Sequence, residues 1–179
     1  MKIEIINGVT PAKVRTLSPK KAIEILHPHL TAGIAEYIYS LKEVNIFLED
    51  YKLDFRIYKH GLWWNCSVKV PKGAISDGSS VPRIGKAIVN DDYHNGAWEA
   101  HDSGYKSKGR DISINGYEIP SLTRKEWDLL FKVITLKNGA TKAGAKLAYT
   151  TLRLGGWKMW GSKGSKNRFS VIDTKSLNP

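Results

Sequence analysis

The sequence predicts an α+β protein in which a small antiparallel β-sheet is followed by a three-helix unit that carries a His-Asp motif. Three observations lead to this prediction. Alternating or apolar runs between residues 44 and 70 are typical of strands. From residue 91 onward, apolar residues recur every three or four positions, as they do on helices. A segment rich in Gly, Ser and Pro over 70–83 separates the two patterns and is typical of a shaped loop.

The N-terminal segment begins with a strand pattern and continues with helical ones. Residues 2–6 are expected to form a short strand that ends at Asn7-Gly8, a pair typical of turns. Residues 18–26 begin with Ser-Pro, which suits a helix cap followed by the first helical residue. A second helical pattern covers 31–43. These elements together could form an arm that docks on a partner.

Strand patterns follow over 45–48, 52–58 and 63–70. The Lys-His-Gly sequence at 59–61 is expected to make a turn between the last two strands. We therefore predict a small antiparallel meander. The one cysteine of the chain, Cys66, lies in an apolar run and is expected to pack in the core.

Helical patterns cover 91–106, 123–138 and 141–154. The second opens with a capping-box sequence, and Asn-Gly follows it as a stop signal. A polar stretch over 109–120 lies between the first two helices and is expected to contain a small hairpin around its Asn-Gly pair. These patterns predict the three-helix unit.

The length of 179 residues suits one domain, or one domain with an appended arm. We divide the chain into an N-terminal arm or extension (1–43), an α+β domain (44–160) and a polar tail (161–179). A single cysteine excludes an internal disulfide framework and a multi-cysteine zinc site. There is no run of 18 apolar residues, so no transmembrane segment is expected.

The charge of the chain is strongly positive, with 28 Lys and Arg against 17 Asp and Glu, and a formal net charge of +11. This excess predicts attraction to polyanions, which include nucleic acid, an anionic membrane surface and acidic neighbours in an assembly. Charge alone does not choose between them. No motif for nucleic-acid recognition accompanies the charge.

One group of residues has the types that acid–base chemistry needs. His101 and Asp102 are adjacent on a predicted helix, and Tyr105 follows one turn later on the face of His101. A neutral imidazole is a natural general base near neutral pH, but it needs a partner that fixes its tautomer. Asp128 on the next helix could be this partner if the two helices pack antiparallel. The small residues Ala97 and Gly104 would leave room beside the imidazole.

Each of these residues also has a simpler explanation. A lone His-Asp pair is more often a surface pair or a helix cap, and a single carboxylate such as Asp128 more often faces solvent. Tyr105 is more often a core residue. Asp77, in a Gly/Ser loop, is more often the first residue of an Asx turn. Trp157 and Trp160 are more often packing residues than a membrane-facing pair.

Four segments occur in order along the chain: VPKGAISDGSSVPR at 70–83, HDSGY at 101–105, RKEWDLLF at 124–131 and RLGGW at 153–157. This order resembles a family of small proteins of tailed bacteriophages and prophages that is known as a domain of unknown function. In that family a VPxGFxTDGASIPR loop precedes a helix with HDxxY and a helix with RxxADxxF. The likeness covers roughly residues 44–160. In this chain Ala74, Ser76 and Trp127 replace the Phe, Thr and Ala of the pattern.

The same order of loop, His-Asp helix and Asp helix is similar, more distantly, to phospholipases of the A-two type. The disulfide set of the secreted members and their glycine loop are missing here. The resemblance implies that His101 is the general base that activates water, and that Asp128 and Tyr105 orient it. It further implies a calcium site formed by Asp102 and the 77–79 segment, that is, Asp77 with backbone carbonyls near Gly78 and Ser79.

These observations predict a phage-encoded protein with a His-Asp hydrolase centre, calcium-dependent and acting on ester bonds of host membrane lipid. An alternative is a non-enzymatic virion or assembly component in which the same cluster is structural. A second alternative is an early phage protein that binds a host factor. The expected partners are other virion proteins or an anionic membrane surface, and the expected location is the virion or the host cytoplasm.

Overall fold

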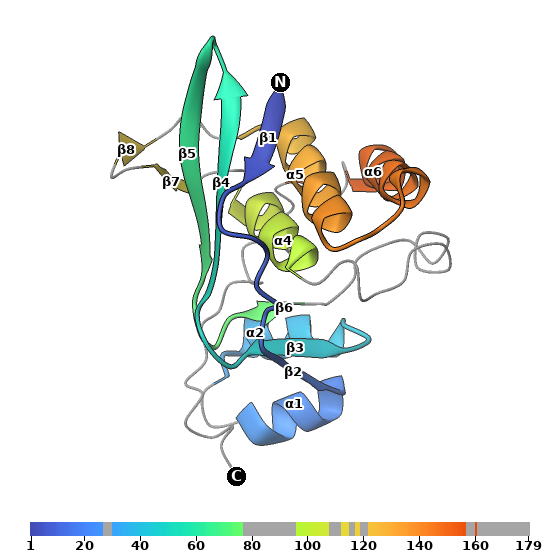
Figure 1. Ribbon diagram of the computed structural model, residues 1–179. Coiled ribbons are helices and arrows are strands. Elements are labelled where there is room, and N and C mark those ends of the chain that lie inside the picture. Colours follow the sequence, from blue (N-terminus) through green and yellow to red (C-terminus); the bar gives the residue numbers. More distant parts are fainter. Residues whose placement is uncertain are drawn as a thin grey trace.

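The computed structural model describes residues 1–26, 30–76, 96–107, 112–114, 117–118, 122–156 and 160. This part of the chain forms two antiparallel sheets and a set of helices, so the predicted α+β class is confirmed (Figure 1). The single small sheet of the prediction is two sheets, of five and three strands.

The larger sheet has the strand order β1-β4-β5-β7-β8 and is antiparallel throughout. Its strands are β1 (Lys2–Ile5), β4 (Tyr51–Lys59), β5 (Leu62–Val70), β7 (Ile112–Ile114) and β8 (Tyr117–Glu118). Alternate residues of β4 are buried, because one face of the sheet covers the core and the other faces solvent. The predicted hairpin of the polar stretch is present as β7 and β8, although the residues of its turn lie outside the described part.

Strands β4 and β5 form a hairpin in which Tyr51 pairs with Val70 at one end and Lys59 with Leu62 at the other. The predicted turn is confirmed. Its two central residues, His60 and Gly61, have φ values of +54° and +81°. A two-residue turn with positive φ at both positions matches the right-handed twist of the strands, which explains why the sequence places a glycine there.

The smaller sheet has the order β2-β3-β6, with β2 (Val14–Leu17), β3 (Val44–Phe47) and β6 (Ile75–Ser76). The helices α1 (Pro19–Leu26) and α2 (Ala32–Tyr39) share a hydrophobic core with it, built around Leu26, Ile38 and Ile46. The predicted continuous meander is therefore wrong at its first strand. Strand β3 pairs with β2 and β6 instead of β4.

Residues 1–43 contribute to both sheets. Strand β1 pairs with β4 in register Ile3 to Ile57, and β2 pairs with β3 in register Arg15 to Ile46. The N-terminal segment is therefore built into the sheets and is not a free arm, since its backbone bonds to strands of the following segment. The polar tail (161–179) lies outside the described residues.

Helices α4 (Ala97–Ser107), α5 (Arg124–Lys137) and α6 (Lys142–Gly155) lie beside the larger sheet (Figure 1). Helix α4 packs against β5 and α5, and α5 packs against α6. The predicted capping box at α5 is confirmed, because Thr123 and Glu126 bond to each other's backbone amides. The described part of the first predicted helix begins at Ala97, and its earlier residues lie outside the description.

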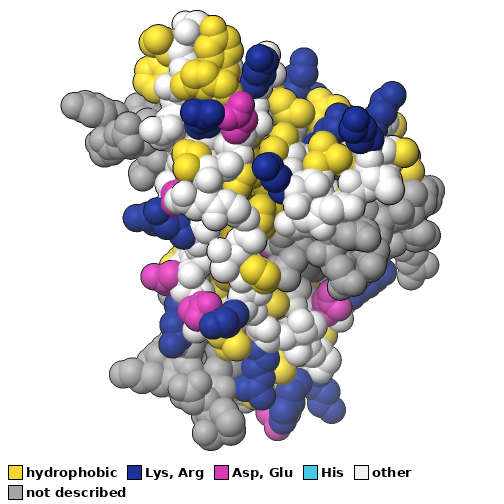
Figure 2. Space-filling model, viewed as in Figure 1, with side chains coloured by type: hydrophobic (Ala, Val, Ile, Leu, Met, Phe, Trp, Pro, Cys, Tyr) yellow, Lys and Arg dark blue, Asp and Glu magenta, His cyan; other side chains and the backbone are white. Residues whose placement is uncertain are grey.

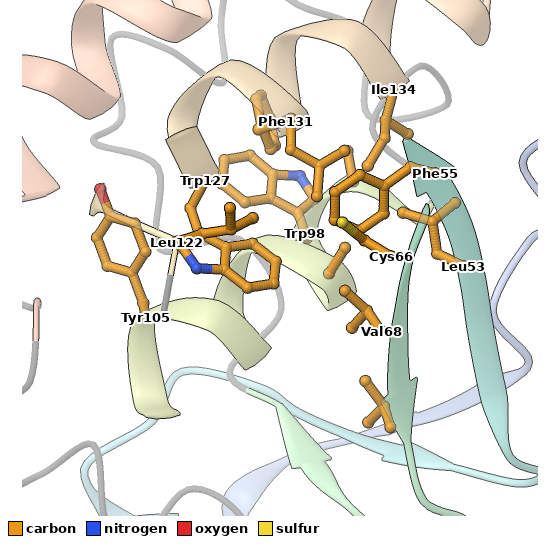
Figure 3. Close-up of a cluster of buried hydrophobic side chains, with 14 of the residues drawn as sticks. Leu53, Phe55, Cys66, Val68, Trp98, Tyr105, Leu122, Trp127, Phe131 and Ile134 are labelled. Carbon is orange, nitrogen blue, oxygen red and sulfur yellow. The ribbon is translucent and has the colours of Figure 1, made fainter. Parts of the chain in front are cut away.

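The main core lies between the larger sheet and these helices. Figure 3 shows Phe55 and Cys66 on the strands pointing toward Trp127 and Phe131 on α5. The prediction that Cys66 packs in the core is confirmed, since its side chain is a free and buried thiol. Burial, with a contribution from the nearby charge of Glu126, raises the pKa of this thiol to about 12.

The space beside Gly104 is filled by Trp127. A Cβ atom at Gly104 would lie 2.0 Å from the indole Cδ2, so α4 and α5 approach closely only because this residue has no side chain. The expectation that Gly104 leaves room beside the imidazole is therefore wrong. Tertiary packing uses that room.

Replacing Gly104 by Ala is expected to lower the free energy of unfolding by about 1–3 kcal/mol, because the methyl group would overpack the core. Helix propensity alone would favour Ala by about 1 kcal/mol, so the sign of the change in unfolding free energy separates the two effects. Urea unfolding measures this change. Gly144→Ala on α6 is the matched control, since its Cβ would meet only the Thr141 hydroxyl at 3.2 Å. Equal midpoints for the two variants would contradict the overpacking.

Candidate active site

Two neighbouring helices place the predicted acid–base residues in the core. His101, Asp102 and Tyr105 lie on α4, and Asp128 lies in the second turn of α5. His101 is 3% exposed and Asp128 is 0% exposed. A histidine and a carboxylate this far from solvent need partners, because an unpaired buried charge is strongly unfavourable.

The expected contact between the two helices is present. His101 Nε2 and Asp128 Oδ1 are 2.9 Å apart, and the hydroxyl of Tyr105 donates to the same carboxylate oxygen. His101 and Tyr105 reach one oxygen because they lie one turn apart on the same face of α4. Their rings also pack against each other, with centroids 4.0 Å apart and planes tilted by 34°. The alternatives of a surface pair and of a solvent-facing Asp128 are wrong.

Sequence reasoning missed a third partner of Asp128. Arg153, near the end of α6, donates from Nη1 to Asp128 Oδ2 over 2.7 Å. The end of α6 is held in place by Arg124, whose guanidinium donates to the carbonyls of Leu152 and Arg153. A signal was available, because Arg153 falls within the fourth sequence segment, RLGGW, at a helix C-terminus where cations are favoured.

The three donors around Asp128 keep it ionised. Burial alone would raise its pKa, but the hydrogen bonds from His101, Tyr105 and Arg153 outweigh burial, and the pKa of Asp128 lies below its usual value. An ionised Asp128 accepts only, so His101 Nε2 must carry the proton of their hydrogen bond. The neutral imidazole then has its lone pair on Nδ1.

His101 Nδ1 has no hydrogen-bond partner within the described residues. The nearest carboxylate oxygen recorded for it, Asp102 Oδ1, lies 3.9 Å away, which is too far for a hydrogen bond. Burial lowers the pKa of His101, but the carboxylates of Asp102 and Asp128 act in the opposite direction, and the net effect is a raised pKa. His101 is therefore a candidate base that is held by Asp128 through Nε2 and has its lone pair on Nδ1, on the other side of the ring.

Asp102 borders a small cavity between α4 and β6. Ser76 Oγ donates to Asp102 Oδ2 over 3.2 Å. The cavity has a volume of about 10 Å³, and Ser76, Glu99, Asp102 and Ser103 are among its lining residues. This is roughly the space that one water-sized group needs. Ser103 Oγ and one carboxylate oxygen of Glu99 lack hydrogen-bond partners in the described part of the chain.

Burial raises the pKa of Glu99 to about 7, and the charge of Asp102 adds to this effect. The folded protein thus binds the proton of Glu99 more tightly than the unfolded chain does. Wild-type stability should therefore fall as the pH rises from 4.5, the usual value, toward 7.

We expect Glu99→Gln to lack this loss. The unfolding free energy of the variant minus that of wild type should be larger at pH 8 than at pH 5, by about 1–3 kcal/mol. Urea unfolding at both pH values measures the difference. Glu36→Gln, which removes an exposed carboxylate on α2, serves as the control. A parallel pH dependence in wild type and Glu99→Gln would show that Glu99 is already ionised in the folded state.

The donors around this cavity are oxygen atoms, which suit a hard cation such as calcium. No group of three or more His, Cys, Asp and Glu side chains forms a metal site among the described residues. Of the predicted calcium ligands, Asp102 is described, whereas Asp77, Gly78 and Ser79 lie outside the described residues. Ser76 directly precedes this segment and contacts Asp102. The described donors fit a cation in type but supply only part of a coordination shell.

Known proteins provide no guide to this centre. No protein-family model, curated protein or solved structure matches the chain. None of the described helices is long and apolar enough to cross a bilayer.

Trp160 is a packing residue, as the simpler explanation predicted, because its ring meets Tyr105 edge to face with centroids 5.0 Å apart. Trp157 lies outside the described residues.

Proposed function

We propose that this protein is a hydrolase in which His101 is the general base and an ester bond of a phospholipid is the substrate. One observation carries the proposal. The imidazole is anchored through Nε2 to a buried, ionised Asp128, while Nδ1 has no hydrogen-bond partner in the described part of the chain. A fixed tautomer with one free lone pair is the arrangement that general-base catalysis requires.

In this proposal Nδ1 of His101 takes a proton from water as the water oxygen attacks the ester carbonyl. The tetrahedral intermediate then collapses, the bond to the leaving alkoxide breaks, and the imidazolium returns the proton to that oxygen. Asp128 stabilises the imidazolium. Tyr105 and Arg153 keep Asp128 ionised and in place, so that three helices position one base.

The helices α4, α5 and α6 act here as the predicted three-helix unit that carries the His-Asp motif. The spacing HDxxY supports the likeness to phospholipases of the A-two type, because both the His and the Tyr of this motif reach Asp128. Within the proposal the protein belongs to the bacteriophage family described above and acts in the virion or the host cytoplasm. An anionic membrane surface is its partner.

A calcium ion bound beside Asp102 would polarise the ester carbonyl and stabilise its oxyanion. Asp102 would hold it, together with Asp77 and the backbone carbonyls of Gly78 and Ser79. Ser76 orients Asp102 through its hydroxyl. This assignment follows from the resemblance and from the oxygen donors at the cavity; Asp77, Gly78 and Ser79 lie outside the described residues.

The burial of the centre favours a second candidate function. His101 is 3% exposed, so a substrate reaches Nδ1 only after neighbouring groups move. A buried network of this kind can instead serve to hold the helices in one arrangement. The protein would then be a non-enzymatic component of a virion or of its assembly, with other virion proteins as partners.

Lipid hydrolysis by the purified protein distinguishes the two functions. We expect release of fatty acid from vesicles of phosphatidylglycerol in the presence of calcium, and loss of release when the ion is removed by a chelator. Asp102→Asn should raise the calcium concentration that release requires, because it removes a proposed ligand. Asp50→Asn, at an exposed aspartate before β4, should not. Absence of release from a folded, calcium-supplied protein would favour the structural function.

A further inference from the structure

The end of the β4–β5 hairpin exposes three apolar side chains, with Tyr58 and Trp63 on one face and the adjacent Leu62 on the opposite face, and we call this end the hairpin tip. The hairpin extends beyond α5 (Figure 1). Leu62 is 61% exposed, Trp63 is 41% exposed and Tyr58 is 39% exposed. Figure 2 shows hydrophobic side chains gathered at this end of the molecule. Tyr58 and Trp63 face each other across the strands with ring centroids 5.4 Å apart.

Basic side chains surround the hairpin tip. Lys2 pairs with Tyr58 across the β1–β4 ladder, and Lys59 stands opposite Leu62. The guanidinium of Arg56 lies 4.6 Å from the ring centre of Trp63. Glu4 and Glu126 pair with Arg56 and Lys59, so three cations meet two carboxylates locally in a chain of net charge +11.

The hairpin tip contacts α5, the helix that carries Asp128. Lys59 Nζ and Glu126 Oε1 are 3.0 Å apart, and Glu126 lies in the first turn of α5, two residues before Asp128. The side chain of Lys59 is 24% exposed and that of Glu126 is 7% exposed, so this contact is largely shielded from solvent. Whatever binds the tip is thereby held beside α5.

We propose that the hairpin tip docks the protein on an anionic lipid surface. Tyr58 and Trp63 have apolar rings with polar edges, which suit the boundary between headgroups and acyl chains. Leu62, next to the turn, would enter the apolar layer, and the exposed Lys2 and half-exposed Arg56 would contact lipid phosphates. The proposal deepens the proposed function by naming where the protein meets its substrate, but docking itself requires no catalysis.

Two features favour lipid over single-stranded nucleic acid at this surface. A base that stacks on an aromatic ring needs an open ring face, and the guanidinium of Arg56 lies over Trp63. The most exposed member, Leu62, has no ring on which to stack a base. An aliphatic side chain next to aromatic rings and cations is instead what a bilayer interface accommodates.

Vesicle co-sedimentation of the full chain tests the docking. We expect stronger binding to phosphatidylcholine vesicles that contain phosphatidylglycerol than to pure phosphatidylcholine, and weaker binding at high salt. Replacing both Leu62 and Trp63 by Thr, which suits a strand, should lower the binding constant at least about tenfold. Leu154→Thr is the matched control, because Leu154 is 74% exposed on α6 and should leave binding unchanged.

Further measurements make the outcomes decisive. Circular dichroism and urea unfolding check that the Leu62→Thr/Trp63→Thr variant is folded; if it is not, Leu62→Thr alone should still weaken binding several-fold. Brominated lipid should quench tryptophan fluorescence less in Trp63→Tyr than in wild type. His101→Asn should bind vesicles as wild type does, so loss of hydrolysis and loss of docking are separable.

Wild-type binding by the folded hairpin variants would overturn the proposal. So would a hairpin variant that keeps vesicle binding but loses affinity for a single-stranded oligonucleotide, since the tip would then bind nucleic acid. A wild-type dimer in sedimentation velocity that becomes monomeric in the hairpin variant, with unchanged vesicle binding, would overturn it in favour of self-association.

Discussion

Replacing Asp128 by Asn is expected to destabilise the folded protein by about 3–5 kcal/mol, because it breaks a buried ion pair from one side. The carboxylate of Asp128 is 0% exposed and accepts from His101, Tyr105 and Arg153. An amide would present two hydrogen atoms to a site that holds three donors and would leave the Arg153 guanidinium without its anion. The midpoint of urea unfolding measures the loss.

An exposed ion pair provides the control for this prediction. Lys13 and Glu49 are 3.1 Å apart, but their side chains are 69% and 53% exposed. Glu49→Gln should therefore change stability by less than about 1 kcal/mol, because solvent screens exposed pairs. If both variants shift the unfolding midpoint equally, Asp128 does not stabilise the protein through this network.

Replacing His101 by Asn is expected to lower ester hydrolysis at least about a hundredfold, because the variant lacks a general base. The substitution keeps a polar group for Asp128 and removes the imidazole lone pair. Fatty-acid release from phosphatidylglycerol vesicles in calcium measures the rate. His60→Asn is the matched control, since His60 is exposed at the hairpin turn with φ +54°, a conformation that Asn accepts.

The pH dependence of hydrolysis adds a readout that loss of folding would not reproduce. The base must be neutral to act, and the carboxylates of Asp102 and Asp128 raise the pKa of His101 above 6.5. Wild-type activity should therefore increase with pH through a midpoint above 6.5. If His101→Asn kept both the wild-type rate and this midpoint, the general base would be another residue.

The sequence by itself determined the local elements of this protein. The alternation over β4 and β5, the turn at His60-Gly61 and the capping box at Thr123 depend on residues within a few positions of one another. Such signals are contained in short windows because they arise from backbone conformation and from the period of burial. The four-residue spacing of His101 and Tyr105 belongs to the same class, since it places both side chains on one face of α4.

Only the tertiary structure decided which elements meet. Strand β3 leaves the meander for β2 and β6, and β1 joins the edge of β4, because pairing between distant strands depends on the whole core and on no local pattern. Arg153 completes the site of Asp128 from a third helix, 25 positions along the chain. The space that Gly104 suggested on α4 is taken by Trp127, since close packing fills the space where two helices meet.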